Sequence, residues 1–229
     1  MAANTDFRAI IKSNNEDRLV EFLHSDEFEK NPVSWFPADK SPLMTVALVN
    51  VHFLDLIVDK LHELGVLEKV CTTRINFTMK NMHFETQNVS MTPLQLVIEI
   101  RTYNAITPLL KYPECWKATY ITSTKNTTAV STCIRHMCIA MGRERTLMEF
   151  VWLEKLLGAE NPYVNVCLKE CEPAEISPID KVFIQMDNLM ERPLGGIRIT
   201  NPDALTQCKE LVALRRSENG SFTKRAVST

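Results

Sequence analysis

The chain has 229 residues, of which 45% are hydrophobic and 24% charged, a composition typical of a globular protein and not of a disordered one. Its 26 basic and 28 acidic residues leave a formal net charge of −2, which excludes a global field drawing the chain to nucleic acid or to an anionic membrane. With only 6 glycines, the sequence also disfavours glycine-rich phosphate loops.

The N-terminal segment lacks the apolar core of a secretory signal, and no apolar run is long enough to span a bilayer. The 7 cysteines are odd in number and scattered through apolar patterns, as expected for reduced thiols. We therefore expect a protein of the cytoplasm, or of the nucleus, that is neither secreted nor membrane-bound.

Three segments begin in the same way, with a hydroxyl residue, a proline and an apolar residue. They start at Ser41, Thr92 and Ser177. The hydroxyl oxygen can accept a hydrogen bond from a free N–H, and proline in the first turn needs no donor, so each segment predicts the start of a helix. Amphipathic segments at 53–61 and 105–110 follow the first two and predict the second helices of helical hairpins.

Between the first two of these pairs, residues 74–79 alternate between polar and apolar side chains, which is typical of a strand. Met82 and Phe84 could belong to a returning strand, so we expect a β-hairpin finger there. Residues 113–127 and 158–176 are expected to form two further enlarged loops.

The C-terminal part continues the pattern of paired helices. Residues 133–142 and 144–157 predict one more hairpin, in which Trp152 continues the apolar stripe and is expected in the core. The last helix is expected to begin after a capping Asn201 and to end at Arg216, because Asn219-Gly220 follows.

Residues 92–110 resemble an ankyrin repeat. That family reads Thr-Pro-Leu-His-Leu-Ala-Ala, a glycine turn and an apolar helix ending in Leu-Leu, and this chain has Thr92-Pro-Leu-Gln-Leu and Leu109-Leu110. The chain departs from the family because its repeats are longer than about 33 residues and irregular. Asn50 and Arg101 replace the turn glycine, and Pro108 should bend or shorten the second helix.

The resemblance implies an all-α fold, a solenoid of ankyrin-like helical hairpins with short β-hairpin fingers. The expected repeat domain covers 1–216, and a flexible polar tail follows at 217–229. About five repeats are expected, at 5–30, 35–64, 88–112, 128–158 and 175–216.

Aromatic residues outside the helical stripes are candidates for partner contact, because large rigid side chains on a surface mark binding sites. They could instead form small cores within the enlarged fingers. These candidates are Trp35, Phe36, Phe77, Phe84, Trp116 and Tyr120. By resemblance to ankyrin arrays, Asp39, Gln95 and His136 would join them on the concave surface. Replacing Trp116 or Phe84 by alanine should then weaken partner binding without lowering the melting temperature.

The sequence contains none of the recognisable catalytic or nucleotide-binding motifs. We therefore expect a non-catalytic adaptor that binds a partner protein or peptide without a cofactor. One alternative is an RNA-associated adaptor using a stripe of basic side chains, and it predicts binding that falls steeply with salt. That stripe would comprise Arg74, Lys80, Lys117, Lys125 and the basic residues of the C-terminal tail.

A second alternative is a zinc-stabilised protein, since thiols and imidazoles are zinc ligands. Its candidate ligands are Cys133, His136, Cys138, Cys167 and Cys171. On a helix, Cys133 and His136 share a face that Cys138 does not join, so the spacing favours buried cysteines over a metal site.

Overall fold

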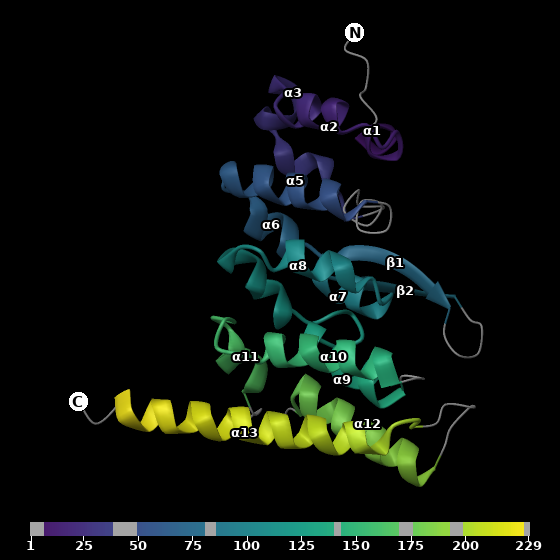
Figure 1. Cartoon of the computed structure of the whole chain (residues 1–229), viewed down its shortest axis with the longest axis vertical. Helices are drawn as coiled ribbons and strands as arrows, with labels where there is room; N and C mark the ends of the chain where they lie inside the picture. Colours follow the sequence, from purple (N-terminus) through teal and green to yellow (C-terminus); the bar gives the residue numbers. More distant parts are fainter. Residues whose placement is uncertain are drawn as a thin grey trace. The chain divides into compact units, whose positions relative to one another are not determined.

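The computed structural model describes residues 7–38, 50–80, 86–139, 143–169, 176–192 and 199–226. Helices predominate, which confirms the all-α class (Figure 1). The chain forms two compact units: unit 1 comprises Met1–Met79 and Thr86–Ala118, and unit 2 comprises Lys80–Glu85 and Thr119–Thr229.

Unit 1 is built from short helices and one β-hairpin. Its elements are α1 (Phe7–Lys12), α2 (Glu16–Leu23), α3 (Asp26–Lys30), η1 (Pro32–Trp35), α5 (Val51–Glu63), α6 (Leu67–Thr72), β1 (Ile75–Lys80), β2 (Thr86–Met91), α7 (Pro93–Glu99), η2 (Tyr103–Ala105), α8 (Ile106–Leu109) and η3 (Pro113–Thr119). The amphipathic segment expected at 53–61 lies within α5. The helix expected after Ser41 falls outside the described residues.

The N-terminal helices of unit 1 surround an aromatic cluster. The rings of Phe7 and Phe22 lie 5.0 Å apart, and Phe22 meets Trp35 edge to face at 5.1 Å. Phe28 and Phe36 complete the cluster. Edge-to-face packing of this kind adds to the stability that burial of the rings provides.

The β-hairpin expected in the first insertion is present, with β1 and β2 as the strands of a two-stranded sheet. Ile75, Val89 and Met91 pack with Leu96 of α7, which fixes the buried face of the hairpin. The alternation at 74–79 therefore predicted β1 correctly. Met82 and Phe84 fall outside the described residues, and β2 begins at Thr86.

The ends of the α7–α8 pair follow the sequence pattern. The side chain of Thr92 accepts a hydrogen bond from Gln95 N at 3.2 Å, and Pro93 occupies the first turn of α7. Arg101, the residue expected at the turn, has a left-handed φ of 60°. Asn50 instead caps α5 from extended backbone, accepting from His52 N and Phe53 N. Helix α8 spans only Ile106–Leu109 and contains Pro108, as expected.

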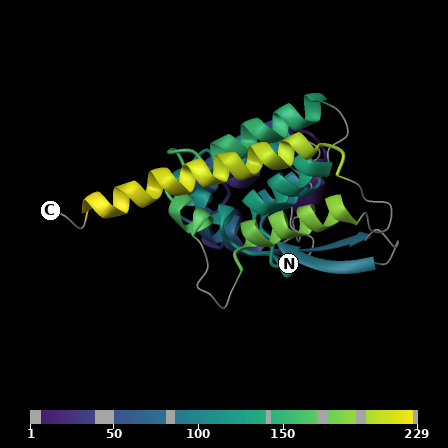
Figure 2. The ribbon, with the colours of Figure 1, turned by 90° about the horizontal axis from the view of Figure 1, so that it is seen from below.

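Unit 2 consists of α9 (Ala129–Ile139), α10 (Arg143–Leu156), α11 (Val164–Leu168), α12 (Pro178–Glu191) and α13 (Pro202–Ala226). Helices α10, α12 and α13 all pack on α9, and Figure 2 shows α12 and α13 from below. Ser177 caps α12 by accepting from Asp180 N at 3.0 Å, and Asn201 caps α13 by accepting from Ala204 N at 3.1 Å.

The expected end of the last helix at Arg216 is wrong, because α13 continues through Asn219-Gly220 to Ala226. Residues 217–226 of the predicted tail are therefore helical. Glycine within a helix costs only about 1 kcal/mol relative to alanine, and local contacts oppose that cost. Arg215 pairs with Glu218 at 2.9 Å, one helical turn away. The expected loops also contain helical turns, namely η3 and α11.

Candidate partner-binding surface

Two of the aromatic residues expected at the partner surface are buried. Phe36 is 4% exposed within the aromatic cluster, and Trp116 is 5% exposed on η3. Trp35 is half-buried, and its ring packs against Phe7 and Phe22. Trp35 and Phe36 thus belong to a small aromatic core, as in the alternative that the sequence left open, and Trp116 is buried as well.

The two remaining aromatic candidates in the described ranges belong to different units. Phe77 is half-buried against the hairpin cluster of unit 1. Tyr120 is half-buried in unit 2, where its ring lies 5.4 Å from that of Tyr163. Asp39 and Phe84 fall outside the described residues.

The polar candidates on the first helices are also buried. Gln95 lies on the buried N-terminal turn of α7, and His136 is buried on α9. Neither side chain can meet a partner at the folded surface. The expected concave surface is therefore not formed by exposed side chains at these two positions.

The basic residues of the nucleic-acid alternative are divided between the two units. Arg74 belongs to unit 1 and Lys125 to unit 2, and both are exposed. Lys117 forms an ion pair with Glu68 at 2.6 Å. The side chain of Lys80 lies outside the described part.

The cysteines expected as alternative zinc ligands lie in separate surroundings. The thiol of Cys133 donates to the backbone oxygen of Glu149 at 3.2 Å, and burial raises its pKa. Cys138 shares a hydrogen bond with Cys208, which together with burial raises the pKa of the Cys208 thiol. Cys167 lies beside Thr119 at 3.3 Å. The thiol of Cys133 therefore stays protonated at neutral pH, whereas nucleophiles and metal ligands are thiolates.

Within the described ranges, no three His, Cys, Asp or Glu side chains are grouped so that they could hold a metal ion. Cys171, the fifth candidate ligand, falls outside these ranges. The described cysteines are free thiols, including Cys71 and Cys115, whose sulfur atoms lie 3.5 Å apart in unit 1.

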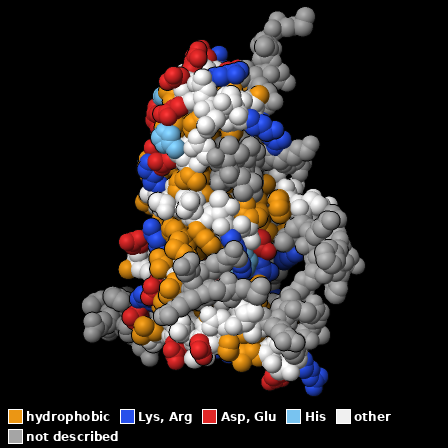
Figure 3. Space-filling model, turned by 45° about the vertical axis from the view of Figure 1, so that its right-hand side comes forward, with side chains coloured by type: hydrophobic (Ala, Val, Ile, Leu, Met, Phe, Trp, Pro, Cys, Tyr) orange, Lys and Arg blue, Asp and Glu red, His pale blue; other side chains and the backbone are white. Residues whose placement is uncertain are grey.

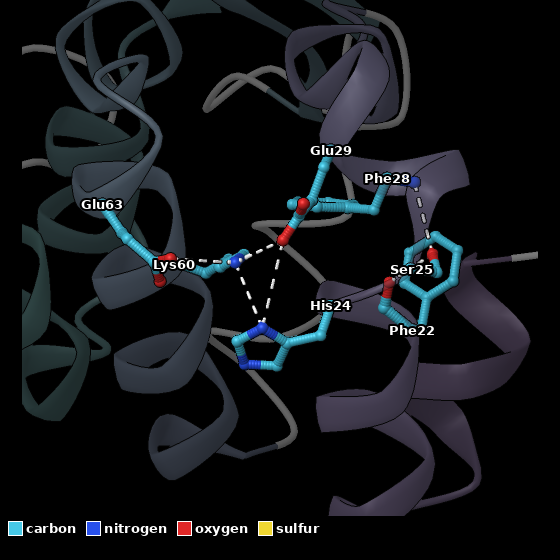
Figure 4. Close-up of polar contacts among 7 residues, drawn as sticks. All are labelled: Phe22, His24, Ser25, Phe28, Glu29, Lys60 and Glu63. Carbon is cyan, nitrogen blue, oxygen red and sulfur yellow. Dashed lines mark hydrogen bonds and ion pairs between the residues drawn. The ribbon is translucent and has the colours of Figure 1, made fainter.

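A buried lysine forms the most connected polar cluster at the N-terminal end of unit 1 (Figure 4). Lys60 of α5 is 5% exposed, and its Nζ lies 2.6 Å from Glu29, 3.2 Å from Glu63 and 3.1 Å from Nδ1 of His24. Because an ammonium only donates, Nδ1 of His24 accepts. Hydrogen bonding to Glu29 raises the pKa of Lys60, although burial opposes this shift. A lysine held in its charged form cannot act as a nucleophile. The role of the cluster is structural, because the Lys60–Glu29 ion pair joins α5 to α3.

Large apolar side chains that reach the surface gather in unit 2. Only Val20 in unit 1 is comparably exposed among the described residues. Those of unit 2 are Leu147, Met148, Val151, Val166, Ile176, Ile184, Met190 and Leu214. Figure 3 shows one face of the molecule, where hydrophobic patches alternate with charged side chains.

Helix α10 carries three of them on one face, defined here as the α10 face: Leu147 (57% exposed), Met148 (46%) and Val151 (57%). Their spacing of three and four residues places them side by side on the helix. The opposite side of α10 is buried through Leu153, Leu156 and Leu157. The helix is thus apolar on both sides, but only one side is covered within the described part of unit 2.

The buried side of α10 also encloses Glu149, whose side chain is 0% exposed. Burial normally favours apolar side chains in the interior and carboxyl groups at the surface. Helix α10 shows the reverse, because Glu149 is buried and the three apolar side chains of the α10 face are exposed. The helix orientation therefore keeps the α10 face accessible. The sequence indicated a second apolar face on α10, because this helix has more apolar residues than one stripe needs. Periodicity alone does not show which of the two faces is covered.

The chain matches no model of a known protein family, no curated protein and no solved structure. Among the described helices, none combines the length and the apolar character needed to cross a bilayer.

Proposed function

We propose that this protein is a non-catalytic adaptor that binds a partner protein through the α10 face of Leu147, Met148 and Val151. The observation that carries the proposal is the exposure of these three adjacent side chains on a helix that buries Glu149 instead. Contiguous apolar surface of this kind marks interaction sites in soluble proteins. Burying one such side chain in a complex contributes roughly 1–2 kcal/mol.

The non-catalytic part of the proposal is supported by the state of the reactive groups. The thiols of Cys71 and Cys133 are buried with raised pKa values, and Lys60 is held charged by Glu29. The described cysteines form no disulfide, which also supports a reducing compartment, the cytosol or the nucleus.

We also propose that the helical hairpins are diverged ankyrin-type repeats. The support lies in the α7–α8 pair, where Thr92 caps the first helix and Arg101 takes the left-handed turn of the family glycine. The hairpin β1–β2 precedes this pair, as a finger would. The partner would then contact α10, the second helix of the α9–α10 hairpin. The first-helix candidates Gln95 and His136 would not contact it, because they are buried.

The proposal is tested by affinity capture from source cells, comparing the native chain with a Leu147→Glu/Val151→Glu variant. Two carboxylates on the α10 face should abolish recovery of a stoichiometric partner protein while leaving the melting temperature unchanged, since both positions are exposed. Val20→Glu is the control, because it places one carboxylate on an exposed apolar position of α2, outside the α10 face.

Equal recovery of the partner by the double variant would remove the α10 face from the proposal. A nuclease-treated sample separates the alternatives, because a partner held through RNA is lost on nuclease treatment and a direct protein partner is retained.

A further inference from the structure

Two buried cysteine thiols lie in contact in unit 1. Cys71 is in the last turn of α6, and Cys115 is on η3, 44 residues later in the chain. Their sulfur atoms are 3.5 Å apart, and the two residues are 3% and 0% exposed. Because a disulfide bond is about 2.0 Å long, the sulfur atoms need to approach each other by roughly 1.5 Å to form one.

The two elements that carry these thiols are also joined by an ion pair. Lys117 of η3 lies 2.6 Å from Glu68 of α6. Glu68 precedes Cys71 by one helical turn and lies on the same side of α6, and Lys117 follows closely after Cys115. Trp116, buried next to Cys115 in the chain, anchors η3 as well. The packing of unit 1 therefore keeps the two thiols in contact.

We propose that Cys71 and Cys115 are an oxidative modification site, at which a hydroperoxide converts the two thiols into an intramolecular disulfide that joins η3 to α6. The oxidant takes two electrons from the pair and is itself reduced to water. The proposal is independent of the α10 face, which belongs to unit 2.

The reaction proceeds in two displacements when the oxidant is hydrogen peroxide. One sulfur attacks a peroxide oxygen, so that an S–O bond forms, the O–O bond breaks and the leaving hydroxide takes the thiol proton as water. The second sulfur then attacks the resulting sulfenic acid. The S–S bond forms, the S–O bond breaks, and the second thiol proton leaves in a second water molecule.

The surroundings of the pair make both formation and reduction of the bond slow. The hydrogen bond with Cys115, together with burial, raises the pKa of the Cys71 thiol, so the reactive thiolate is scarce at neutral pH. A disulfide in the same place is shielded from reducing thiols, because exchange requires access to a sulfur atom. The pair is therefore suited to sustained oxidation and not to catalytic turnover.

The bond would close a loop that contains β1, β2, α7 and α8. A cross-link between residues 44 positions apart restricts the unfolded chain and so raises the stability of the folded one. Oxidation should thus stabilise unit 1.

The test is treatment of the reduced full chain with hydrogen peroxide, well below its melting temperature. Free thiols are then blocked, and the digested chain is mapped by mass spectrometry. We expect a linked pair of peptides that contain Cys71 and Cys115. The melting temperature should rise by at least about 4 °C and return to its original value after reduction with dithiothreitol.

Cys71→Ala is the decisive variant, and its readout is the difference in melting temperature between the oxidised and the reduced form. Any loss of stability from the substitution itself cancels in that difference, as does oxidation of other thiols. We expect Cys71→Ala to lose the rise of the native chain. Cys133→Ala is the matched control and should keep it, because Cys133 is likewise 0% exposed but lies in unit 2.

Free thiols at both positions after oxidation would overturn the proposal, and so would a link from either cysteine to a different one. A Cys71→Ala variant that peroxide stabilises as much as the native chain would also overturn it. The Leu147→Glu/Val151→Glu variant should form the same bond as the native chain, so this proposal and that of the α10 face can fail separately.

Discussion

The guanidinium of Arg216 binds the carboxylate of Asp180 through two parallel hydrogen bonds, each of 3.0 Å. The hydroxyl of Ser177 donates to the same carboxylate at 2.5 Å while it caps α12. One carboxylate therefore joins the first turn of α12 to α13. Arg216 also donates to the backbone oxygen of Leu168, so the contact extends to the end of α11.

This contact makes the stability of unit 2 dependent on pH. Partial burial raises the pKa of Asp180, but the hydrogen bonds from Arg216 and Ser177 outweigh it, so the pKa lies below its ordinary value. A group with a lowered pKa in the folded state stabilises above its unfolded pKa of about 3.9, and this stability is lost as the pH falls through the folded pKa. We expect a decrease in the free energy of unfolding below about pH 4.

Asp180→Asn should lower the free energy of unfolding at pH 7 by about 1 kcal/mol, allowing for solvent screening of a partly exposed pair. It should also make the acid limb below pH 4 shallower. Urea denaturation at several pH values measures both effects. Asp203→Asn, at an exposed position in the first turn of α13, is the control for loss of one carboxylate. An unchanged acid limb in the Asp180 variant would contradict the assignment.

The Lys60 cluster of Figure 4 gives a second prediction. Lys60→Met keeps the volume of the side chain but leaves Glu29 without its cation at 2.6 Å. We expect the melting temperature to fall by roughly 3–6 °C. Lys111→Met is the matched control, since Lys111 pairs with Asp55 and Asp59 at the surface and should cost less.

A double-mutant cycle tests whether the effect comes from the Lys60–Glu29 pair. Glu29→Gln should destabilise the native chain but have almost no further effect when Lys60 is already methionine. Additive effects of the two changes would show that Lys60 stabilises through packing of its carbon chain instead.

The backbone at Arg101 gives a third prediction, because a φ of 60° is costly for any side chain with a Cβ. Arg101→Gly and Arg101→Ala both remove the arginine contacts, but only glycine relieves the backbone. We expect the glycine variant to be about 1 kcal/mol more stable than the alanine variant by urea denaturation. Equal stabilities would contradict a left-handed backbone at residue 101.

Local chemistry made part of this fold predictable from the sequence. Hydroxyl and amide caps act over three residues, so Thr92, Ser177 and Asn201 indicated the starts of α7, α12 and α13 correctly. Alternation over 74–79 indicated β1 in the same way. Such signals depend only on neighbouring residues and not on tertiary packing.

The candidate surface could not be predicted, because it depends on what covers each helix. Of the apolar side chains Leu147, Val151 and Leu153 of α10, only Leu153 is buried. Trp152, expected in the core, is half-buried beneath Lys155. A helix with apolar residues all round has no preferred inner face until its neighbours are known.

Trp116 is the residue at which the structure reverses the expected outcome of a mutation. It lies on η3 between the buried residues Cys115 and Ala118, and the thiol of Cys115 lies 3.5 Å from that of Cys71 on α6. The expected loop is therefore a 3-10 turn held against the core by its apolar side chains, with Trp116 as the largest of them.

Trp116→Ala should consequently lower the free energy of unfolding by about 3–5 kcal/mol, through lost burial and the cavity it leaves. Trp116→Phe retains most of the ring and should lose less than half of that. Urea denaturation of both variants measures the difference. A Trp116→Ala variant with native stability and weakened partner binding would restore Trp116 to the contact surface. Destabilisation instead places it in the core, where any loss of binding follows from unfolding and should be recovered at lower temperature.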